Sequence, residues 1–376
     1  MKADTSKSIR VAAAQNEPVW GDLEGTVNKT LDIIRDAASK GVQMLALPEL
    51  WIPGYPKWIW SLPALEWAGH WEKYIANSLK VDSPQMMRIR MCCQQNQIWV
   101  NVGFAERDGY SLYMSTCWIT STASAGAIAS HRRKIMPTGV ERVMFGQSSG
   151  DSLDNVIDSP FGRLGSLMCW EHAQPLLRYH TATQGEEIHV ASWPYLFPES
   201  AEELHTGMTN VGCLTLSRAM AIEAGTFVLV ATCVMSKSGA LLLGLKPEAS
   251  EKRTFQIPGG GASRVFGPDG RVIAGGDMPD DMEGLVIADI DVQEVVTAKT
   301  LMDSIGHYSR PDLLTLSVNT TRHPVAVQRS TDHKLAASII SRYPTLDIDT
   351  AQQREEVGLD AASGPQESNG GSEVMV

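Results

Sequence analysis

A cysteine stands where an apolar strand gives way to a helix in the stretch SLMCWEHAQPLL, residues 166–177. Cysteine is a nucleophile only as the thiolate, so a reactive cysteine needs a nearby base or positive charge and some access to solvent. At such a strand end the side chain of Cys169 would lie above the edge of a sheet, where free backbone N–H groups also point. The alternative is a buried core thiol, which is the usual state of a cysteine in an apolar run.

A carboxylate ends a second predicted strand, in LALPELWIPGYPKW at residues 45–58. Glu49 follows the apolar residues of that strand, and prolines with Gly54 then stiffen a loop rich in aromatic residues. Beside these rings a carboxylate would be poorly solvated, so its pKa would rise toward that of a useful general base. The alternative is a charge at a strand terminus that reaches solvent.

A third predicted strand ends in a basic cluster, in SHRRKIMPTGVERVMFGQ at residues 130–147. Because side chains alternate along a strand, Lys134 and Arg132 share one face and Arg133 lies on the other. A single lysine could therefore lie inside a site while its neighbours stay in water. The alternative is a solvated face or a patch that binds anions.

The strands that end in Glu49, Lys134 and Cys169 must meet at one end of the fold if these residues act together. Two groups of predicted strands alternate with helices, which favours an α/β fold of two packed sheets, a four-layer α-β-β-α sandwich. The predicted strands are 8–15, 42–48, 98–107, 111–120, 125–134, 161–170, 187–194, 226–235 and 284–291, and a further hairpin spans 263–276. The predicted helices are 26–41, 174–185 and 213–225.

Two dipeptides predict tight hairpin turns, Asp108-Gly109 and Asp269-Gly270. Connections between strands stay short as far as about residue 315, so we expect one domain at 1–315. A C-terminal extension at 316–376 follows, and its last part, rich in Gly, Ser, Glu and Gln, is expected to be disordered. Apolar clusters within 316–345 could pack on a neighbouring subunit.

Composition excludes several classes of function. The 376 residues carry a formal net charge of -11, which disfavours nucleic acid as a partner, and no apolar window is long enough to span a membrane. Six cysteines in such a chain are sparse, which indicates a reduced, cytoplasmic protein without a disulfide framework. No histidine pairs with a cysteine or acid at a metal-ligand spacing, so neither a metal nor another cofactor is expected. The five cysteines other than Cys169 are expected to pack in the core: Cys92, Cys93, Cys117, Cys213 and Cys233.

The ordered motifs resemble the nitrilase superfamily, and specifically its nitrilase branch. The matching segments are PEL with Glu49, HRRKIMPTGVER with Lys134 and Glu141, and MCWEH with Cys169. Supporting segments are VAAAQNEPVWGD, WIPGYPKW, HVASWP and GHYSRPDLL, so the resemblance covers roughly residues 8–315. It implies the nitrilase (carbon-nitrogen hydrolase) fold and homo-oligomers in which dimers stack into helical filaments, with residues 50–80 and 316–345 at the contacts.

The resemblance also implies catalytic roles. Cys169 would attack the nitrile carbon to give a thioimidate and then a thioester, Glu49 would act as general base and later as general acid, and Lys134 would stabilise the developing negative charge. Glu141 would position Lys134 and the proton relay. The backbone N–H of Trp170 is a second candidate donor to the tetrahedral centres.

The expected substrate is an organic nitrile that is hydrolysed to the carboxylic acid and ammonia. CWEH, with His172, resembles arylacetonitrilases and cyanide-converting enzymes, and aromatic side chains suit a ring one carbon away from the nitrile. The expected substrate-binding residues are Trp51, Tyr55, Trp170, His172 and Trp193. The alternatives are a cyanide hydratase that forms formamide and, in another class, a non-catalytic member that only assembles or binds.

Overall fold

The described part of the chain belongs to one structural unit, Met1–Val327. In this computed structural model the described residues are 8–121, 126–199, 205–245 and 258–322. Most of the predicted extension 316–376 lies outside the described residues, and its boundary at residue 315 stays a prediction. None of the helices in these ranges has the length and apolar character that a bilayer crossing requires.

Strand β1 (Ser8–Asn16) is buried on both faces and separates two cores. Val11 and Ala13 pack in an apolar cluster between the two sheets. Ala12 and Ala14 point the other way, into a cluster shared with the first helix of the chain. Alternation along one strand thus supplies two layers of contact, as expected for a strand inside a sandwich.

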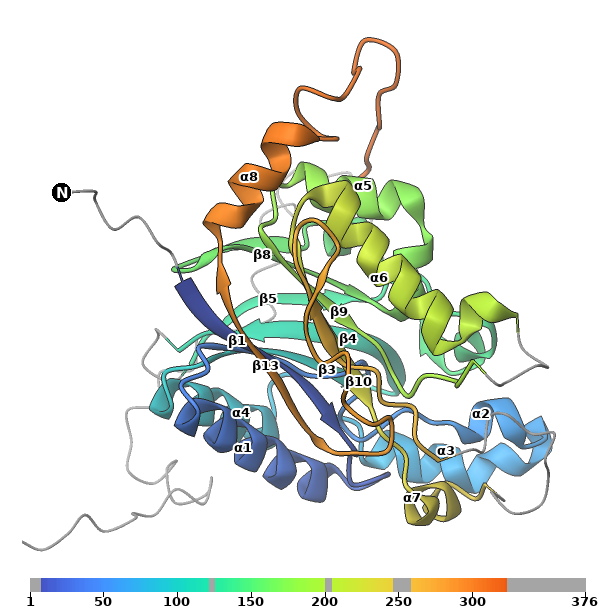
Figure 1. The fold of residues 1–376 in the computed structure, drawn as a ribbon. Coiled ribbons are helices and arrows are strands. Elements are labelled where there is room, and N and C mark those ends of the chain that lie inside the picture. Colours follow the sequence, from blue (N-terminus) through green and yellow to red (C-terminus); the bar gives the residue numbers. More distant parts are fainter. Residues whose placement is uncertain (1–7, 122–125, 200–204, 246–257, 323–376) are drawn as a thin grey trace, which may run out of the picture. The chain divides into compact units, whose positions relative to one another are not determined.

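Two sets of strands face each other across this central cluster (Figure 1). One set has the order β5-β4-β3-β2-β1, with β13 on the far side of β1 and β6 beside β4; the other has the order β7-β8-β9-β10-β11-β12. The first set comprises β1, β2 (Met44–Ala46), β3 (Trp99–Asp108), β4 (Ser111–Ile119), β5 (Ile128–Arg133), β6 (Phe145–Gly146) and β13 (Gly284–Asp291). The second comprises β7 (Val156–Ser159), β8 (Gly162–Met168), β9 (Ile188–Ser192), β10 (Phe227–Cys233), β11 (Arg264–Phe266) and β12 (Val272–Ala274).

The two sets are joined by a short seam. Strands β1 and β10 pair in parallel at Gln15–Thr232 and Asn16–Cys233, which makes the 13 strands one continuous sheet. The packed layers expected from the sequence are confirmed, but the seam was not predicted.

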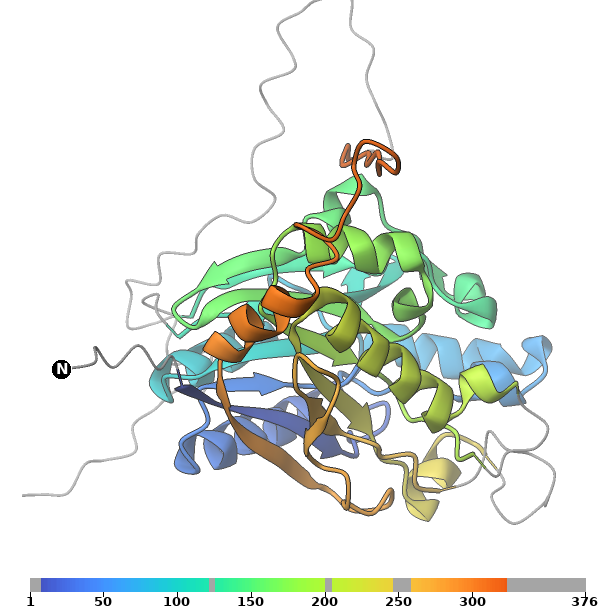
Figure 2. The ribbon, with the colours of Figure 1, turned by 45° about the horizontal axis from the view of Figure 1, so that its top comes forward.

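Helices cover both outer faces of the strands. Figure 1 shows α1 and α4 on one side and α5 and α6 on the opposite side, and Figure 2 shows the same arrangement from a second direction. The helices are α1 (Leu23–Ser39), α2 (Trp58–Ser61), α3 (Trp67–Ala76), α4 (Pro84–Gln95), α5 (Pro175–Thr183), α6 (Asn210–Ala224), α7 (Lys237–Leu242) and α8 (Gln293–Leu301). Short 3-10 helices are η1 (Ala64–Glu66), η2 (Gly139–Val143), η3 (Gly150–Leu153), η4 (Cys169–Ala173) and η5 (Thr206–Met208).

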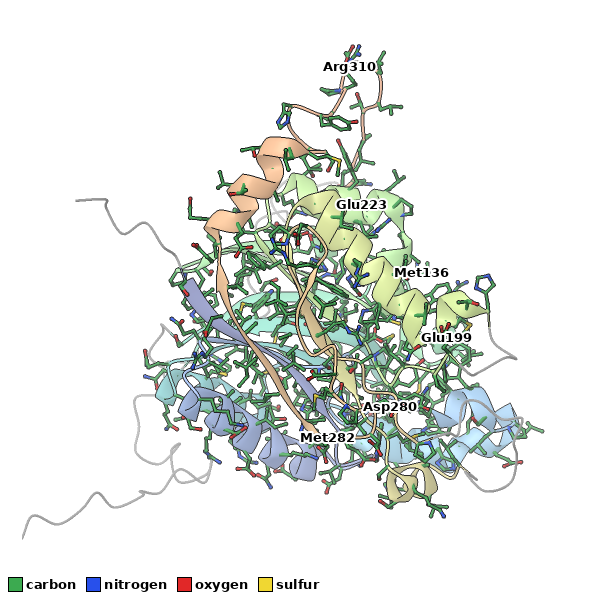
Figure 3. All side chains as sticks on the ribbon, viewed as in Figure 1. Met136, Glu199, Glu223, Asp280, Met282 and Arg310 are labelled. Carbon is green, nitrogen blue, oxygen red and sulfur yellow. The ribbon has the colours of Figure 1, made fainter. Side chains whose placement is uncertain are left out.

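The helix boundaries follow capping residues that periodicity alone does not locate. The first predicted helix begins at Leu23, before the predicted start at residue 26, because the Asp22 side chain accepts the N–H of Gly25 at 3.0 Å. Helix α6 ends where expected, at Gly225 with φ 60°. The ion pair Arg178–Glu223 at 3.0 Å links α5 to α6, and Figure 3 labels Glu223 near the end of α6.

Both predicted hairpins are present. Gly109 has φ 64° in the turn between β3 and β4, and Gly270 has φ 81° between β11 and β12. Such positive φ values are the reason that glycine is needed at these turns.

The carboxyl ends of several strands point the same way. Strands β2, β1, β10, β9 and β8 are neighbours in parallel, and β5 runs in the direction of β3 because two antiparallel pairings separate them. Residues that follow β2, β5, β8 and β9 can therefore converge at one end of the sandwich, as the sequence led us to expect.

Candidate active site

The candidate active site lies at the end of the sandwich toward which the carboxyl ends of β2, β5 and β8 point. One of its residues follows each of these strands: Glu49, Lys134 and Cys169. Glu49 lies in the turn after β2, Lys134 comes directly after β5, and Cys169 comes directly after β8 and opens η4. Glu49 and Lys134 are in direct contact, and the charges of both act on the Cys169 sulfur. The structure thus brings together the three side chains that the sequence placed at separate strand ends.

Lys134 lies between two carboxylates. Its Nζ donates to Glu49 Oε1 at 2.8 Å and to Glu141 Oε2 at 3.1 Å, and all three side chains are buried. Within the described part of the chain, Glu49 Oε2 has no hydrogen-bond partner. Glu49 therefore offers one oxygen to Lys134 and keeps the other available for a proton from a reacting group.

Two donors hold Glu141 in addition to Lys134. The Tyr55 hydroxyl donates to Oε1 at 2.7 Å, and the Thr138 backbone N–H donates to Oε2 at 2.6 Å. The indole N–H of Trp60 in turn donates to the Tyr55 oxygen at 2.9 Å. A carboxylate with this many donors is fixed in place, so Glu141 can hold the Lys134 ammonium group in a defined position.

Burial changes the acidity of the cluster. Burial raises the pKa of Glu49, the Lys134 charge opposes the rise and the Glu141 charge adds to it, and the resulting pKa is about 7. Burial lowers the pKa of Lys134, but Glu141 and Glu49 more than compensate and hold it well above its usual range. Near neutral pH, Glu49 can therefore both accept and return a proton while Lys134 stays charged.

The Cys169 thiol rests protonated. Burial and the Glu49 charge raise its pKa well above the usual range, and the Lys134 charge opposes that rise. Because only the thiolate is a good nucleophile, this thiol would have to lose its proton in order to attack a substrate. Glu49, with a pKa of about 7, is the buried base suited to that transfer.

The backbone at Cys169 is held in an unusual conformation. Its φ is 48°, in the left-handed region that few residues other than glycine adopt. The Cys169 carbonyl oxygen lies 2.8 Å from His172 Nδ1, so the imidazole ring fixes the peptide that follows the sulfur. A strained, clamped turn of this kind is typical of a functional residue.

A buried chain of three hydrogen bonds leads away from this carbonyl. His172 Nε2 lies 3.0 Å from His189 Nε2, and His189 Nδ1 lies 2.7 Å from Glu186 Oε2. Each of the three contacts needs one hydrogen atom between its two heavy atoms. Two neutral imidazoles supply two N–H hydrogens in total. The Cys169 carbonyl and an ionised Glu186 carboxylate supply none, because both only accept hydrogen bonds. Three hydrogen bonds in this chain therefore require one hydrogen more than two neutral imidazoles carry.

A second buried ion pair lies under the lysine strand. Arg132 donates two hydrogen bonds of 2.7 Å to Glu171, which also accepts the N–H groups of Ile135 at 2.8 Å and Met168 at 2.9 Å. Glu171 thus ties the turn after Lys134 to the strand that ends at Cys169. The sequence placed Arg132 and Lys134 on one face, but the expectation that Arg132 stays in water is wrong, because Glu171 neutralises it inside the fold.

A cavity of about 50 Å³ opens beside the sulfur. Its wall is mainly aromatic and apolar, and four half-buried side chains mark its mouth: Trp60, Thr138, Trp170 and Met208. The buried lining residues are Tyr55, Lys57, Glu141, Cys169, Trp193, Pro194, Tyr195, Leu196, Phe197 and Cys213. A mostly apolar pocket with a few convergent polar groups is the usual form of a small-molecule site.

Three of the five residues expected to bind substrate line this cavity, namely Tyr55, Trp170 and Trp193. Trp51 does not line it: its indole N–H donates to the Thr30 hydroxyl of α1 at 2.8 Å, in the outer core. His172 lies behind the sulfur and stacks on Trp193 with ring centroids 5.3 Å apart. The structure therefore places His172 against the Cys169 carbonyl, and Trp51 where it packs against α1.

Several residues that line the cavity were not predicted from the sequence. One of them is Lys57, which stands between Pro56 and Trp58 in the aromatic loop. A lysine among aromatic residues is the sequence feature that could have identified it. Phe197 and Met208 carry no comparable signal in their local pattern. Cys213 was expected in the core and is buried, but it also lines the cavity.

All six cysteines are buried free thiols. Within the described ranges, no group of three or more His, Cys, Asp or Glu side chains could hold a metal ion.

Sequence comparison places the chain among known proteins. The carbon-nitrogen hydrolase family model matches residues 10–300. An arylacetonitrilase of Hypocrea virens is 50% identical over 320 residues, which are 84% of this chain and 93% of the relative. An arylacetonitrilase of Aspergillus niger is 47% identical over 310 residues, 82% and 92% of the two chains. A nitrilase of Penicillium rubens is 46% identical over 327 residues, 86% and 96%.

Solved structures share the fold at low sequence identity. The C. elegans NitFhit protein superposes with a TM-score of 0.61 at 20% identity, over 85% of this chain and 69% of that one. An amidase from Nesterenkonia sp. AN1, solved as a double mutant in complex with acrylamide, gives a TM-score of 0.55 at 16% identity, over 79% and 96%. At such identities the likeness concerns the four-layer architecture.

Proposed function

The chain belongs to the carbon-nitrogen hydrolase family, and from this premise we propose that it is a nitrilase that hydrolyses arylacetonitriles to carboxylic acids and ammonia. The observation that carries the proposal is the buried contact of Lys134 with Glu49 and Glu141 next to the Cys169 sulfur, in a cavity with aromatic walls. The roles of these four residues are part of the proposal.

In the first step the Cys169 sulfur adds to the nitrile carbon. A carbon–sulfur bond forms, one carbon–nitrogen π bond breaks, and the thiol proton passes through Glu49 to the nitrogen, giving a thioimidate. Glu49 is suited to this transfer because its Oε2 has no other partner among the described residues and its pKa is about 7. The substrate gains the proton that the cysteine loses, so the step is balanced.

Two waters complete the reaction. Glu49 takes a proton from the first water as its oxygen bonds to the thioimidate carbon, and returns that proton to the nitrogen. The remaining hydroxyl proton of the tetrahedral centre then follows through Glu49, the carbon–nitrogen bond breaks, ammonia leaves and a thioester remains. The second water attacks in the same way, the carbon–sulfur bond breaks, and the carboxylic acid leaves while Cys169 regains its proton. Expulsion of the thiolate from the first tetrahedral centre would give the amide instead.

Lys134 and the Trp170 backbone N–H stabilise the charge of these centres. Two carboxylates fix Lys134, and the Trp170 amide follows the Cys169 peptide that His172 holds, which supports these roles. Removal of one such donor typically lowers the rate by about 10²- to 10³-fold.

The aromatic wall supports an arylacetonitrile as the substrate class. Trp60, Trp170 and Trp193 line the cavity and offer rings on which an aryl group can stack. Its volume of about 50 Å³ suits the nitrile and the adjoining carbon, whereas a cavity that admits benzene measures about 150 Å³. An aryl ring therefore enters only if the half-buried Trp60, Trp170 and Met208 turn aside and widen the cavity.

The decisive experiment is a product assay with phenylacetonitrile. The purified full chain should release phenylacetic acid and ammonia, and rapid quenching should trap an acyl mass on Cys169. Cys169→Ala removes only the sulfur and serves as the control that should be inactive with the fold retained. Turnover by that variant, or a wild-type preference for cyanide with formamide as product, would remove the proposal. Cyanide hydratase and a non-catalytic role receive no support from the arylacetonitrilase relatives.

We further propose a homo-oligomer, with dimers stacked into helical filaments, and a cytoplasmic location. The exposed leucines Leu65, Leu313 and Leu314 support the oligomer, because large apolar side chains left in water mark contact surfaces. The free thiols support a reducing compartment. Light scattering and electron microscopy test the assembly, and a strict monomer at working concentration would contradict it.

A further inference from the structure

Lys57 is a second lysine in the cavity, and the catalytic scheme does not use it. It lies at the N-terminal cap of α2, its side chain is 1% exposed, and it lines the cavity together with Cys169. Its Nζ lies 3.8 Å from the ring centroid of Phe197 and 4.0 Å from that of Tyr195. The amine is therefore inside the site and covered by rings on one side.

The surroundings of Lys57 differ from those of Lys134. Lys134 binds two carboxylates, whereas Lys57 has no hydrogen bond or ion pair with any residue in the described ranges. Burial lowers the pKa of Lys57 well below its usual range, and the groups that oppose this fall are cysteine sulfurs, with Cys169 first. A buried amine with rings as its only partners lacks an acceptor for its N–H groups.

The ring wall cannot readily move away to let water supply that acceptor. A Cβ on Gly260 would lie 2.2 Å from the Tyr195 ring, so the backbone of the glycine turn packs directly on that ring. The Leu196 N–H donates to the Gly260 carbonyl at 3.0 Å and fastens the two segments together. An acceptor for Lys57 must therefore come from the cavity, where the substrate binds.

We propose that Lys57 determines substrate specificity and selects nitriles whose aryl group carries an oxygen acceptor, either a hydroxyl or a carboxylate. This inference rests on the proposed function and names the substrate class of the same site. A site that hydrogen-bonds a substrate group discriminates strongly against analogues that lack it, because its own polar group is then left unpaired. The bare arylacetonitrile is such an analogue here.

The test compares matched substrates on the wild-type enzyme. The 4-hydroxy, 4-methyl and 4-carboxy derivatives of phenylacetonitrile, and the corresponding 3-substituted set, differ in the acceptor more than in size. We expect kcat/KM for the best oxygen-bearing substrate to exceed that for its methyl counterpart by about 5- to 150-fold, the range for leaving one buried donor unpaired. A preference for hydroxyl indicates a neutral Lys57 amine, and a preference for carboxylate indicates the ammonium ion.

Lys57→Met then assigns the preference to this residue. Methionine keeps the length of the side chain and removes the donor, so the ratio of the two kcat/KM values should fall to near one, and any general loss of activity cancels in the ratio. Lys80→Met, on an exposed lysine away from this cavity, is the matched control and should keep the ratio.

The outcomes separate this inference from the proposed function. Equal or better turnover of the methyl substrates by the wild type at both ring positions would overturn the role of Lys57 while leaving a nitrilase. An unchanged ratio in Lys57→Met would do the same. Absence of turnover of every nitrile in the wild type would overturn the proposed function itself. If Lys57→Met does not fold, the wild-type substrate pairs still decide.

Discussion

Arg132 and Glu171 form a buried ion pair with two hydrogen bonds of 2.7 Å, and the pair joins the two sheets beneath the candidate active site. Arg132 lies on β5 of one sheet, and Glu171 lies in η4, directly after β8 of the other. Glu171 also accepts N–H groups from Ile135 and Met168, neighbours of Lys134 and Cys169. The distance between Lys134 and the Cys169 sulfur therefore depends on the Arg132–Glu171 ion pair, although neither Arg132 nor Glu171 bonds to the Lys134 or Cys169 side chain.

Arg132→Met should destabilise the protein by about 3–5 kcal/mol, because it leaves the Glu171 carboxylate buried without its partner. The double variant Arg132→Met with Glu171→Leu should recover much of that loss in urea unfolding, since no buried charge remains. Activity should stay low in the double variant, because the N–H groups of Ile135 and Met168 lose their acceptor. If Arg132→Met lowers the free energy of unfolding by less than about 1 kcal/mol, the ion pair does not hold the two sheets together.

The rate should depend on pH through Glu49. This carboxyl must be ionised to accept the thiol proton, and its pKa is raised to about 7. The kcat/KM for an uncharged nitrile should therefore fall about tenfold per pH unit below pH 7. An acid limb with a midpoint near the ordinary carboxyl value of 4.5 would show that Glu49 is not the base.

The stability of the protein should respond to Glu49 in the opposite direction from its response to a carboxylate whose pKa is lowered by a salt bridge. Between pH 4.5 and about 7 the unfolded chain loses the Glu49 proton while the folded chain keeps it, so this group makes the native state less stable as pH rises. Glu49→Gln removes the titration, and its stability relative to wild type should increase across that window by about 3 kcal/mol. Thermal unfolding of both proteins from pH 4 to 8 measures this, and a difference independent of pH would refute it.

The hydrogen-bonded chain that holds the Cys169 carbonyl runs through His172 and His189 to Glu186. It should tolerate an amide in place of the Glu186 carboxyl group. Glu186→Gln can donate a hydrogen to His189 Nδ1 and so keeps three hydrogens in the chain, whereas Glu186→Leu supplies none. We expect Glu186→Gln to keep stability within about 1 kcal/mol and Glu186→Leu to lose about 1–3 kcal/mol together with a fall in kcat. Equal damage from both changes would contradict the proton count.

Local sequence patterns predicted much of the site, because its main residues each end a strand. Glu49, Lys134 and Cys169 follow apolar runs whose ends are visible without a structure, and parallel strands bring such ends together. The two hairpins were equally local, since an Asp-Gly pair specifies its own turn. The layered architecture followed from the alternation of strands and helices.

The rest depends on partners that are remote in the sequence. Arg132 was expected in water because its partner Glu171 lies 39 positions away. Trp51 was expected in the pocket, but the direction of a side chain in a proline-rich loop is set by the surrounding packing, and here it reaches Thr30. Lys57 acquires its rings only when the segment of Tyr195 and Phe197 folds beside it.

The seam at Gln15–Thr232 and Asn16–Cys233 has a consequence for renaturation. Glu49 and Lys134 follow strands of one sheet and Cys169 follows a strand of the other, so either half alone lacks a complete catalytic set. Several strands of each half pair with strands near in sequence, β3 with β4, β4 with β5 and β8 with β9, but the two halves must join before the sulfur meets its proton acceptor. After dilution from denaturant, enzymatic activity should therefore return later than the helical circular dichroism signal. The delay between the two measures how long the halves take to pair along the seam.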